Sequence, residues 1–201
     1  MDQDRLRRQI AFALAIDDEK QVLRQTHLTH HGRRENDAEH AWHLTVMAYL
    51  LREYANDEID IARTMIMCAC HDLVEIYAGD TYAYDTQGQT SAHDRETKAA
   101  DRLFSILPDD QAKELRGIWE EFEANDTPEA RFAHAMDSVQ PMILNDSNGG
   151  ADWKARGITR DKPAGRNQLT RKGSEVLADY IEDLLDRNVE AGSLKPAPED
   201  A

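Results

Sequence analysis

Residues 59–78 constrain the fold more than any other stretch, because apolar side chains surround nearly the whole of the helix that they predict. The segment CACHDLVEIYAGD, from Cys68 to Asp80, lies at the end of this stretch. A helix without a polar face has to be covered by other helices, and Gly79 is a residue type that commonly ends one. The stretch therefore predicts the central buried helix of a helical bundle.

Helical spacing of apolar residues continues along most of the chain. Pro108 and Pro128 suit helix starts, and Asp37 is expected to cap the N-terminus of another helix. No segment has a supported strand pattern. Helices are expected at about 4–25, 38–55, 59–78, 91–107, 108–125, 128–145 and 173–188. We therefore predict an all-α fold, a bundle of six to seven helices that forms a single domain over residues 1–190.

Two segments depart from this helical pattern. Residues 151–172 are rich in Lys and Arg, and we expect them to form a surface loop, with a lid over a site or a contact with a partner as alternatives. Residues 191–201 are polar and contain two prolines, which is typical of a disordered tail.

The formal net charge of −15 restricts the partners of the chain. A nucleic-acid polymer needs a basic footprint and is not expected, whereas a small anion can bind where a metal and a few arginines reverse the local field. No apolar run reaches the ~18 residues of a membrane span, so no membrane contact is expected. The N-terminal residues lack the layout of a signal peptide. Cys68 and Cys70 are two residues apart on one helix, so their side chains point in different directions and a disulfide is not expected. The expected location is therefore the cytoplasm.

Three polar residues interrupt the apolar helix. His71, Asp72 and Glu75 are spaced so that all three can face one side of it. A buried carboxylate without a partner costs several kcal/mol, so it takes up a proton, pairs or binds a cation. The pattern leaves two interpretations open, a hydrogen-bonded buried pair and a metal site.

Two further helices offer partners for these residues. His40 lies early in the helix expected at 38–55, and Asp137 interrupts the apolar stretch RFAHAMDSVQPMIL. Together with His71 and Asp72 they would supply two nitrogen and two oxygen ligands. Such a mixed set suits a divalent first-row metal.

The order EHAW, then HDLVEIYAGD, then a later Asp resembles the HD-domain family of metal-dependent phosphohydrolases, over roughly residues 23–144. Within that family the likeness is to the branch of bacterial 5′-deoxynucleotidases and their eukaryotic relatives. The resemblance implies four ligands for a divalent cation (Mn, Co, Fe, Ni, Mg or Zn), namely His40, His71, Asp72 and Asp137. We expect one cation, because the sequence has one HD motif and no second His-rich set.

The resemblance also implies roles outside the ligand set. Glu75 would act, together with the ligand Asp72, as a catalytic residue that moves a proton or orients water. Relatives carry an Arg-Trp pair ahead of the first ligand, but the corresponding stretch here, LRQTHLTHHGRR, has no Trp. The residues expected to bind the substrate are Arg24, Arg33, Arg34 and Asp80.

The function implied by this resemblance is hydrolysis of a small phosphomonoester by a metal-activated water. The leading substrate is a (deoxy)nucleoside 5′-monophosphate, and the expected assembly is a homodimer. Two alternatives stay open: an HD-fold nucleotide-binding or regulatory protein with a structural metal, and a phosphodiesterase.

Overall fold

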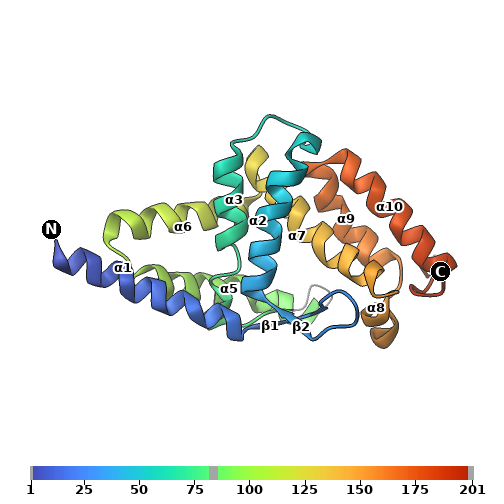
Figure 1. The fold of residues 1–201 in the computed structure, drawn as a ribbon, viewed down its shortest axis with the longest axis horizontal. Coiled ribbons are helices and arrows are strands. Elements are labelled where there is room, and N and C mark those ends of the chain that lie inside the picture. Colours follow the sequence, from blue (N-terminus) through green and yellow to red (C-terminus); the bar gives the residue numbers. More distant parts are fainter. Residues whose placement is uncertain (1, 82–85, 199–201) are drawn as a thin grey trace.

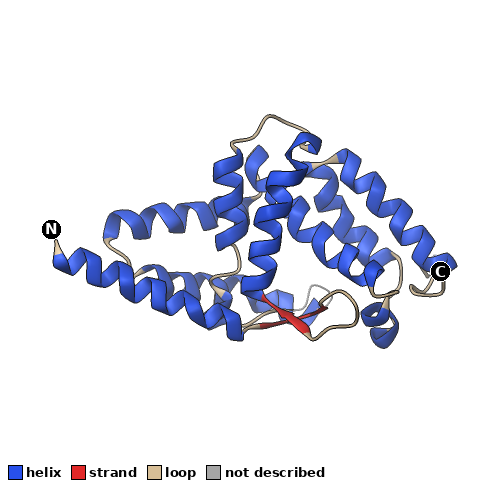
Figure 2. Ribbon diagram, in the orientation of Figure 1, coloured by secondary structure: helices blue, strands red, loops and turns tan. Residues whose placement is uncertain are grey.

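A computed structural model describes residues 2–81 and 86–198 of the chain, with the backbone alone for 86–92. Helices make up most of these residues, so the all-α prediction is confirmed (Figure 2). The α-helices are α1 (Gln3–Ala15), α2 (Asp37–Leu51), α3 (Ile61–Cys70), α4 (Glu75–Ala78), α5 (Thr86–Phe104), α6 (Asp109–Ala124), α7 (Pro128–Ser147), α8 (Ala151–Arg156), α9 (Asp161–Gly173) and α10 (Glu175–Glu190). The described residues thus form ten α-helices rather than six or seven.

Helices α2, α3 and α7 occupy the middle of the molecule, with α1, α5 and α6 on one side and α8, α9 and α10 on the other (Figure 1). Helix α7 is the most enclosed, because it packs against α2, α3, α6, α9 and α10. Small residues such as Ala130 and Ala133 allow this close packing, and both are fully buried. The prediction that residues 59–78 form the central helix was wrong in this respect, since Ile66 of α3 is exposed.

Capping side chains set the starts of the helices around the site. Asn36 caps α2 by accepting a hydrogen bond from the backbone N–H of Glu39, whose side chain in turn accepts one from the backbone of Asn36. The predicted cap, Asp37, is instead the first residue of the helix and is fully buried. Thr127 caps α7, with Pro128 in the first turn as expected.

The first predicted helix, 4–25, is wrong beyond Ala15. A 3-10 helix over Ile16–Gln21 follows α1, and the chain then enters a two-stranded antiparallel sheet of β1 (Leu23–His27) and β2 (Arg34–Asn36). The strands are short and mostly polar, so they lack the alternation that predicts a strand from sequence. The sheet matters for the site because it carries residue 24 alongside α7.

The predicted helix 59–78 is interrupted over residues 71–74, where a turn separates α3 from α4. Hydrogen bonds that span three residues replace the helical ones here, for example from Glu75 N to Asp72 O at 2.8 Å. The predicted end at Gly79 is confirmed: this residue has φ 77° and closes α4 by donating to Glu75 O. The turn presents successive side chains to the same centre, as described below.

The basic segment 151–172 is not a surface loop, because it forms α8 and most of α9. Pro163, Asn167 and Thr170 are buried at helical spacing on α9, which packs against α7. The expected disordered tail also differs, since Leu194 is buried and Lys195 N donates to Ile158 O at 3.1 Å. Residues 199–201 of that tail lie outside the described residues.

The tightest approach of α9 to α7 is at Gly173, where an added Cβ would lie 2.2 Å from Arg131 O. Because backbone cannot yield as a flexible side chain can, we expect Gly173→Ala to lower the free energy of unfolding by roughly 1–3 kcal/mol. Urea denaturation measures this loss. Gly165→Ala is the matched control on the same helix, since a Cβ there meets nothing within 4 Å. Equal stability of the two variants would contradict the prediction.

Candidate metal centre and adjoining cavity

Four side chains from three parts of the chain converge at one point. His40 comes from α2, His71 and Asp72 from the turn after α3, and Asp137 from α7. His40 Nε2 lies 3.1 Å from Asp137 Oδ1 and 3.9 Å from Asp72 Oδ2. His71 Nε2 lies 3.0 Å from Asp72 Oδ2 and 3.9 Å from Asp137 Oδ1. The structure thus brings together all four residues that the sequence predicted as metal ligands.

Hydrogen bonds on the far side of each imidazole fix which nitrogen faces this cluster. His71 Nδ1 donates to the carbonyl oxygen of Cys68 at 3.0 Å, so the proton of the neutral ring lies on Nδ1. His40 Nδ1 donates to Gln140 Oε1 at 3.1 Å, and the amide of Gln140 is oriented by donating to Glu35 Oε1 at 2.7 Å. Both rings, when neutral, therefore direct an Nε2 lone pair at the carboxylates, which is the tautomer a metal ligand needs.

The geometry and the burial of these atoms fit a divalent cation. For bonds of about 2.0–2.2 Å to nitrogen and oxygen, neighbouring ligand atoms lie about 3–3.5 Å apart. Two of the four contacts, at 3.0 and 3.1 Å, match this spacing, and the other two, at 3.9 Å, are slightly longer. His40 is fully buried, His71 is 4% exposed, and Nε2 of His71 has no hydrogen-bond partner among the described residues. A lone pair buried against a carboxylate is unfavourable unless a proton or a cation lies between them. These four residues could therefore hold a metal ion.

Charges within the cluster perturb the pKa values of its members. Burial opposes the charged form of His71, but Asp72 and Asp137 prevail and raise its pKa to about 9. Burial likewise opposes ionisation of Asp72, whereas His71 and Arg24 hold its pKa well below the usual range. Burial also opposes ionisation of Asp137, but Arg166 and His40 lower its pKa in the same way. Both aspartates are thus carboxylates at neutral pH, as metal ligands have to be.

A second layer of carboxyl groups lies next to the cluster. Burial, together with Asp72 and Asp37, raises the pKa of Glu75 to about 11, so Glu75 carries a proton at neutral pH. Burial and the charge of Asp72 also raise the pKa of Asp37 and of Glu19 to about 7. One oxygen each of Asp37, Asp72 and Glu75 lies within 4.8 Å of the others. The site thus combines ionised aspartates with one neighbouring acid, Glu75, that retains a proton, and two, Asp37 and Glu19, that titrate near neutral pH.

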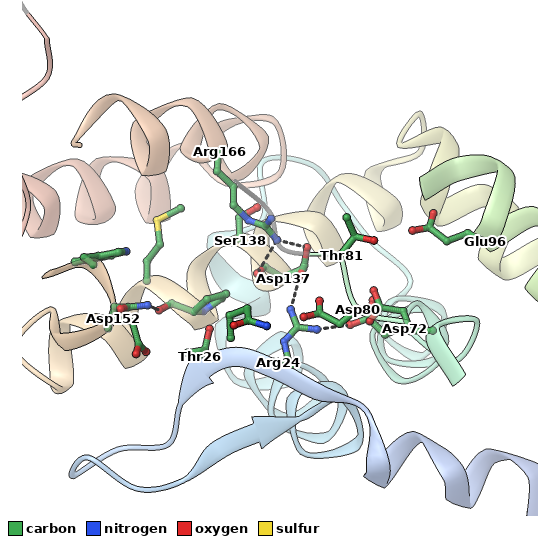
Figure 3. Close-up of a pocket in the computed structure, with 16 residues that line it drawn as sticks. Arg24, Thr26, Asp72, Asp80, Thr81, Glu96, Asp137, Ser138, Asp152 and Arg166 are labelled. Carbon is green, nitrogen blue, oxygen red and sulfur yellow. Dashed lines mark hydrogen bonds and ion pairs between the residues drawn. The ribbon is translucent and has the colours of Figure 1, made fainter. Parts of the chain in front are cut away.

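A cavity of about 190 Å³ opens beside the cluster (Figure 3). Two arginines, Arg24 from β1 and Arg166 from α9, flank Asp137 in this cavity (Figure 3). Arg24 Nη1 donates to Asp72 Oδ2 at 2.7 Å, and Arg166 Nη2 donates to Asp137 Oδ2 at 2.7 Å. The other lining residues are Gln25, Thr26, Asp72, Glu75, Asp80, Thr81, Glu96, Ser138, Pro141, Met142, Asn145, Asp152 and Trp153.

The predicted substrate residues divide into two groups. Arg24 and Asp80 line the cavity, and burial raises the pKa of Asp80. Arg33 and Arg34 do not line it: both are exposed, and Arg33 forms an ion pair with Glu39. Arg33 lies in the β1–β2 connection, and Arg34 pairs with His27, at the opposite end of β1 from Arg24.

The sequence did not indicate that Arg166 lines the cavity or that Gln140 forms a hydrogen bond with His40. Arg166 lies in a segment with little apolar patterning, so the sequence did not indicate that it faces α7. The signal that could have found it is the set of small residues spaced three or four apart around it, Pro163, Asn167 and Thr170, which form the buried face of α9. Gln140 follows Asp137 by three positions, so it lies on the same side of α7.

The protein thus belongs to a class of all-helical proteins with one polar cluster beside a cavity. Two histidines and two aspartates from three parts of the chain form this cluster. The sequence profile of the HD domain matches residues 16–177. The chain therefore belongs to the HD-domain family, and the resemblance predicted from its sequence is confirmed.

Similar proteins fall into two groups. A crystal structure of a predicted metal-dependent phosphohydrolase from Magnetospirillum magnetotacticum MS-1 superposes with a TM-score of 0.91, at 46% identity and 97% coverage of both chains. Human 5′-deoxynucleotidase HDDC2 is 31% identical over 115 residues, which are 57% of this chain and 54% of the relative. The 5′-deoxynucleotidase hdd1 of Schizosaccharomyces pombe is 24% identical over 55% of this chain and 58% of its own. The chain thus spans about half the length of the curated relatives that it matches.

Proposed function

We propose that the protein is a metal-dependent phosphohydrolase that acts on a small phosphomonoester, with a deoxynucleoside 5′-monophosphate as the preferred substrate. The observation that carries this proposal is the convergence of two imidazole Nε2 atoms and two ionised carboxylates beside a cavity lined by two arginines. Similarity to a metal-dependent phosphohydrolase and to 5′-deoxynucleotidases supports the substrate class.

In this proposal His40, His71, Asp72 and Asp137 hold one divalent cation. The cation would offset the negative charge of the phosphate and lower the pKa of a bound water. Gln140 and the Cys68 carbonyl keep the two imidazoles in the ligating tautomer. Asp72 contributes doubly, because it also accepts a hydrogen bond from Arg24 and so orients that guanidinium at the cavity.

Glu75 is the proposed proton donor. It lines the cavity beside Asp72, and burial together with the charges of Asp72 and Asp37 raises its pKa, which favours the protonated form. A protonated carboxyl group can pass a proton to the leaving alkoxide oxygen of the ester. Asp80 lies in the same cavity, and its role is to accept a hydrogen bond from a substrate hydroxyl.

The organic part of the ester would occupy the side of the cavity formed by Met142, Asn145 and Trp153. Asn145 Oδ1 is buried there without a hydrogen-bond partner in the described part of the chain, so it is available to a donor group of a ligand. A wall of apolar groups with one unpartnered acceptor suits a nucleobase.

Removal of the metal tests the proposal directly. Protein treated with a chelator is expected to lose all phosphate release, and addition of Mn, Co, Fe, Ni, Mg or Zn singly should restore it for at least one metal. The substrate panel should contain matched deoxynucleoside and ribonucleoside 5′-monophosphates, with bis-p-nitrophenyl phosphate as the diester. A protein that binds metal but hydrolyses no monoester would contradict the proposal, and hydrolysis of the diester alone would indicate a phosphodiesterase.

A binding or regulatory protein is the second candidate, favoured by the enclosed position of the cluster among buried helices. Thermal shift distinguishes it from the enzyme, since nucleotides would stabilise such a protein without being consumed. No helix in residues 2–81 and 86–198 combines the length and the apolar character that crossing a membrane requires. The homodimer and the cytoplasmic location stay predictions.

A further inference from the structure

The basic segment 151–172 brings one of its cationic side chains to the cavity. Arg166 lines the cavity, whereas Arg160 pairs with Glu182 and Asp186, and Arg171 pairs with Asp179 at the surface. Of these three arginines, Arg166 is therefore the one placed in the cavity, by the face of α9 that packs on α7.

Arg166 is only partly engaged by its protein partner. Its Nη2 donates to Asp137 Oδ2 at 2.7 Å, while its Nε is buried without a hydrogen-bond partner among the described residues. Arg24 Nη1 lies between two carboxylates, 2.7 Å from Asp72 and 3.3 Å from Asp37, and its Nε is likewise buried without a partner in the described part of the chain. The side chain of Arg166 is the more exposed of the two, 22% against 13%, so it presents more of its donors to a ligand in the cavity.

The position of Arg166 relative to the cluster also favours an anion. Asp137 Oδ1 faces His40 and His71. Its other oxygen accepts a hydrogen bond from Arg166 (Figure 3), so a single carboxylate separates the guanidinium from the imidazole nitrogens. The cavity is lined by six carboxyl groups and two arginines among the described residues. The carboxyl groups are Asp72, Glu75, Asp80, Glu96, Asp137 and Asp152. Because negative charge on these carboxyl groups opposes the binding of an anion, a dianionic phosphate needs the cationic donors that the cavity offers.

We infer that Arg166 binds the phosphate group of the substrate through its free guanidinium edge, while its Nη2 holds Asp137 in place. The inference rests on the proposed function and adds a phosphate-binding residue from the C-terminal helices to it. A planar guanidinium can engage a carboxylate and a phosphate from different edges, which a lysine ammonium cannot reproduce.

The test measures phosphate binding apart from turnover. Inorganic phosphate is titrated calorimetrically into the full chain at saturating Mn²⁺, for the wild type, Arg166→Gln, Arg166→Lys and the control Arg171→Gln on the same helix. We expect the Kd of phosphate to rise about 10–100-fold in Arg166→Gln and less in Arg166→Lys, because a lysine keeps the charge but loses the fork. The KM for the monophosphate should rise in parallel, and Arg171→Gln should match the wild type.

Two results would overturn the inference. One is an unchanged Kd of phosphate in both Arg166 variants. The other is a loss of Mn²⁺ affinity with unchanged phosphate binding at Mn²⁺ saturation, which would limit Arg166 to positioning Asp137. Because the Kd is measured without turnover, a wild type that binds phosphate but hydrolyses no ester would refute the proposed function, and the variants would still show whether Arg166 binds phosphate.

Discussion

Asp72→Ala is expected to abolish both cation binding and phosphate release. Asp72 contacts His71 Nε2 at 3.0 Å and Arg24 Nη1 at 2.7 Å, so its loss removes a ligand and the partner of a buried arginine together. We expect the metal content to fall to background and kcat/KM to fall by more than about 10³-fold, since an outer contact to a ligand alone is worth about 10–100-fold. Metal analysis of the dialysed protein and a phosphate-release assay measure the two effects.

The control for this experiment is Asp179→Ala, which removes an exposed aspartate paired with Arg171 outside the cavity. His71→Ala should reproduce the loss of metal and activity, because it removes a ligand from the same turn. Circular dichroism establishes that the variants keep their helices. Full activity in either site variant would mean that the reaction takes place elsewhere in the protein.

Glu75→Gln is expected to lower kcat by about 10²–10⁴-fold while metal content is retained. Burial and the neighbouring charges of Asp72 and Asp37 keep Glu75 protonated at neutral pH, and glutamine has nearly the same shape and hydrogen-bonding groups as that form. The amide cannot release a proton to the leaving oxygen, so the loss should appear in kcat more than in KM. Steady-state kinetics on the preferred monophosphate, together with metal analysis, measure this separation.

Two comparisons make the Glu75 result specific. Glu120→Gln, on the exposed side of α6, should leave both kinetic constants unchanged. A nitrophenyl ester, whose leaving group needs no proton, should be hydrolysed by Glu75→Gln with a much smaller loss than a nucleotide. Equal losses on both esters would assign Glu75 to a role other than protonation of the leaving group.

The sequence predicted the helices that have a strong apolar stripe and clear end signals. Helices α6 and α7 begin close to the expected prolines, and α2 and α10 lie close to their expected ranges, because burial of a periodic apolar face dominates their stability. It missed the β1–β2 sheet and α9, which are polar and depend on contacts with α7 rather than on an apolar stripe. The break over residues 71–74 was hidden because Leu73 and Val74 continue the apolar pattern of α3 and none of the four residues is Gly or Pro.

The sequence indicated residues of the candidate site where their chemistry conflicts with the local apolar pattern. Imidazole and carboxylate groups in apolar helices are unfavourable unless they meet, so His71, Asp72 and Asp137 were conspicuous in the sequence. Arginines in polar segments present no such conflict, which is why Arg33 and Arg166 could not be told apart before the tertiary structure placed one on the surface and one in the cavity.

The spread of the four cluster residues from position 40 to position 137 links the site to global stability. An unfolded chain cannot assemble these groups, so a cation that binds them binds only the native state and shifts the folding equilibrium. Each tenfold rise of the free cation above its Kd then adds about 1.4 kcal/mol to the free energy of unfolding. A bound cation would thus join the first turn of α2, the end of α3 and the middle of α7, and metal supply in the cell would help to determine how long the folded protein survives.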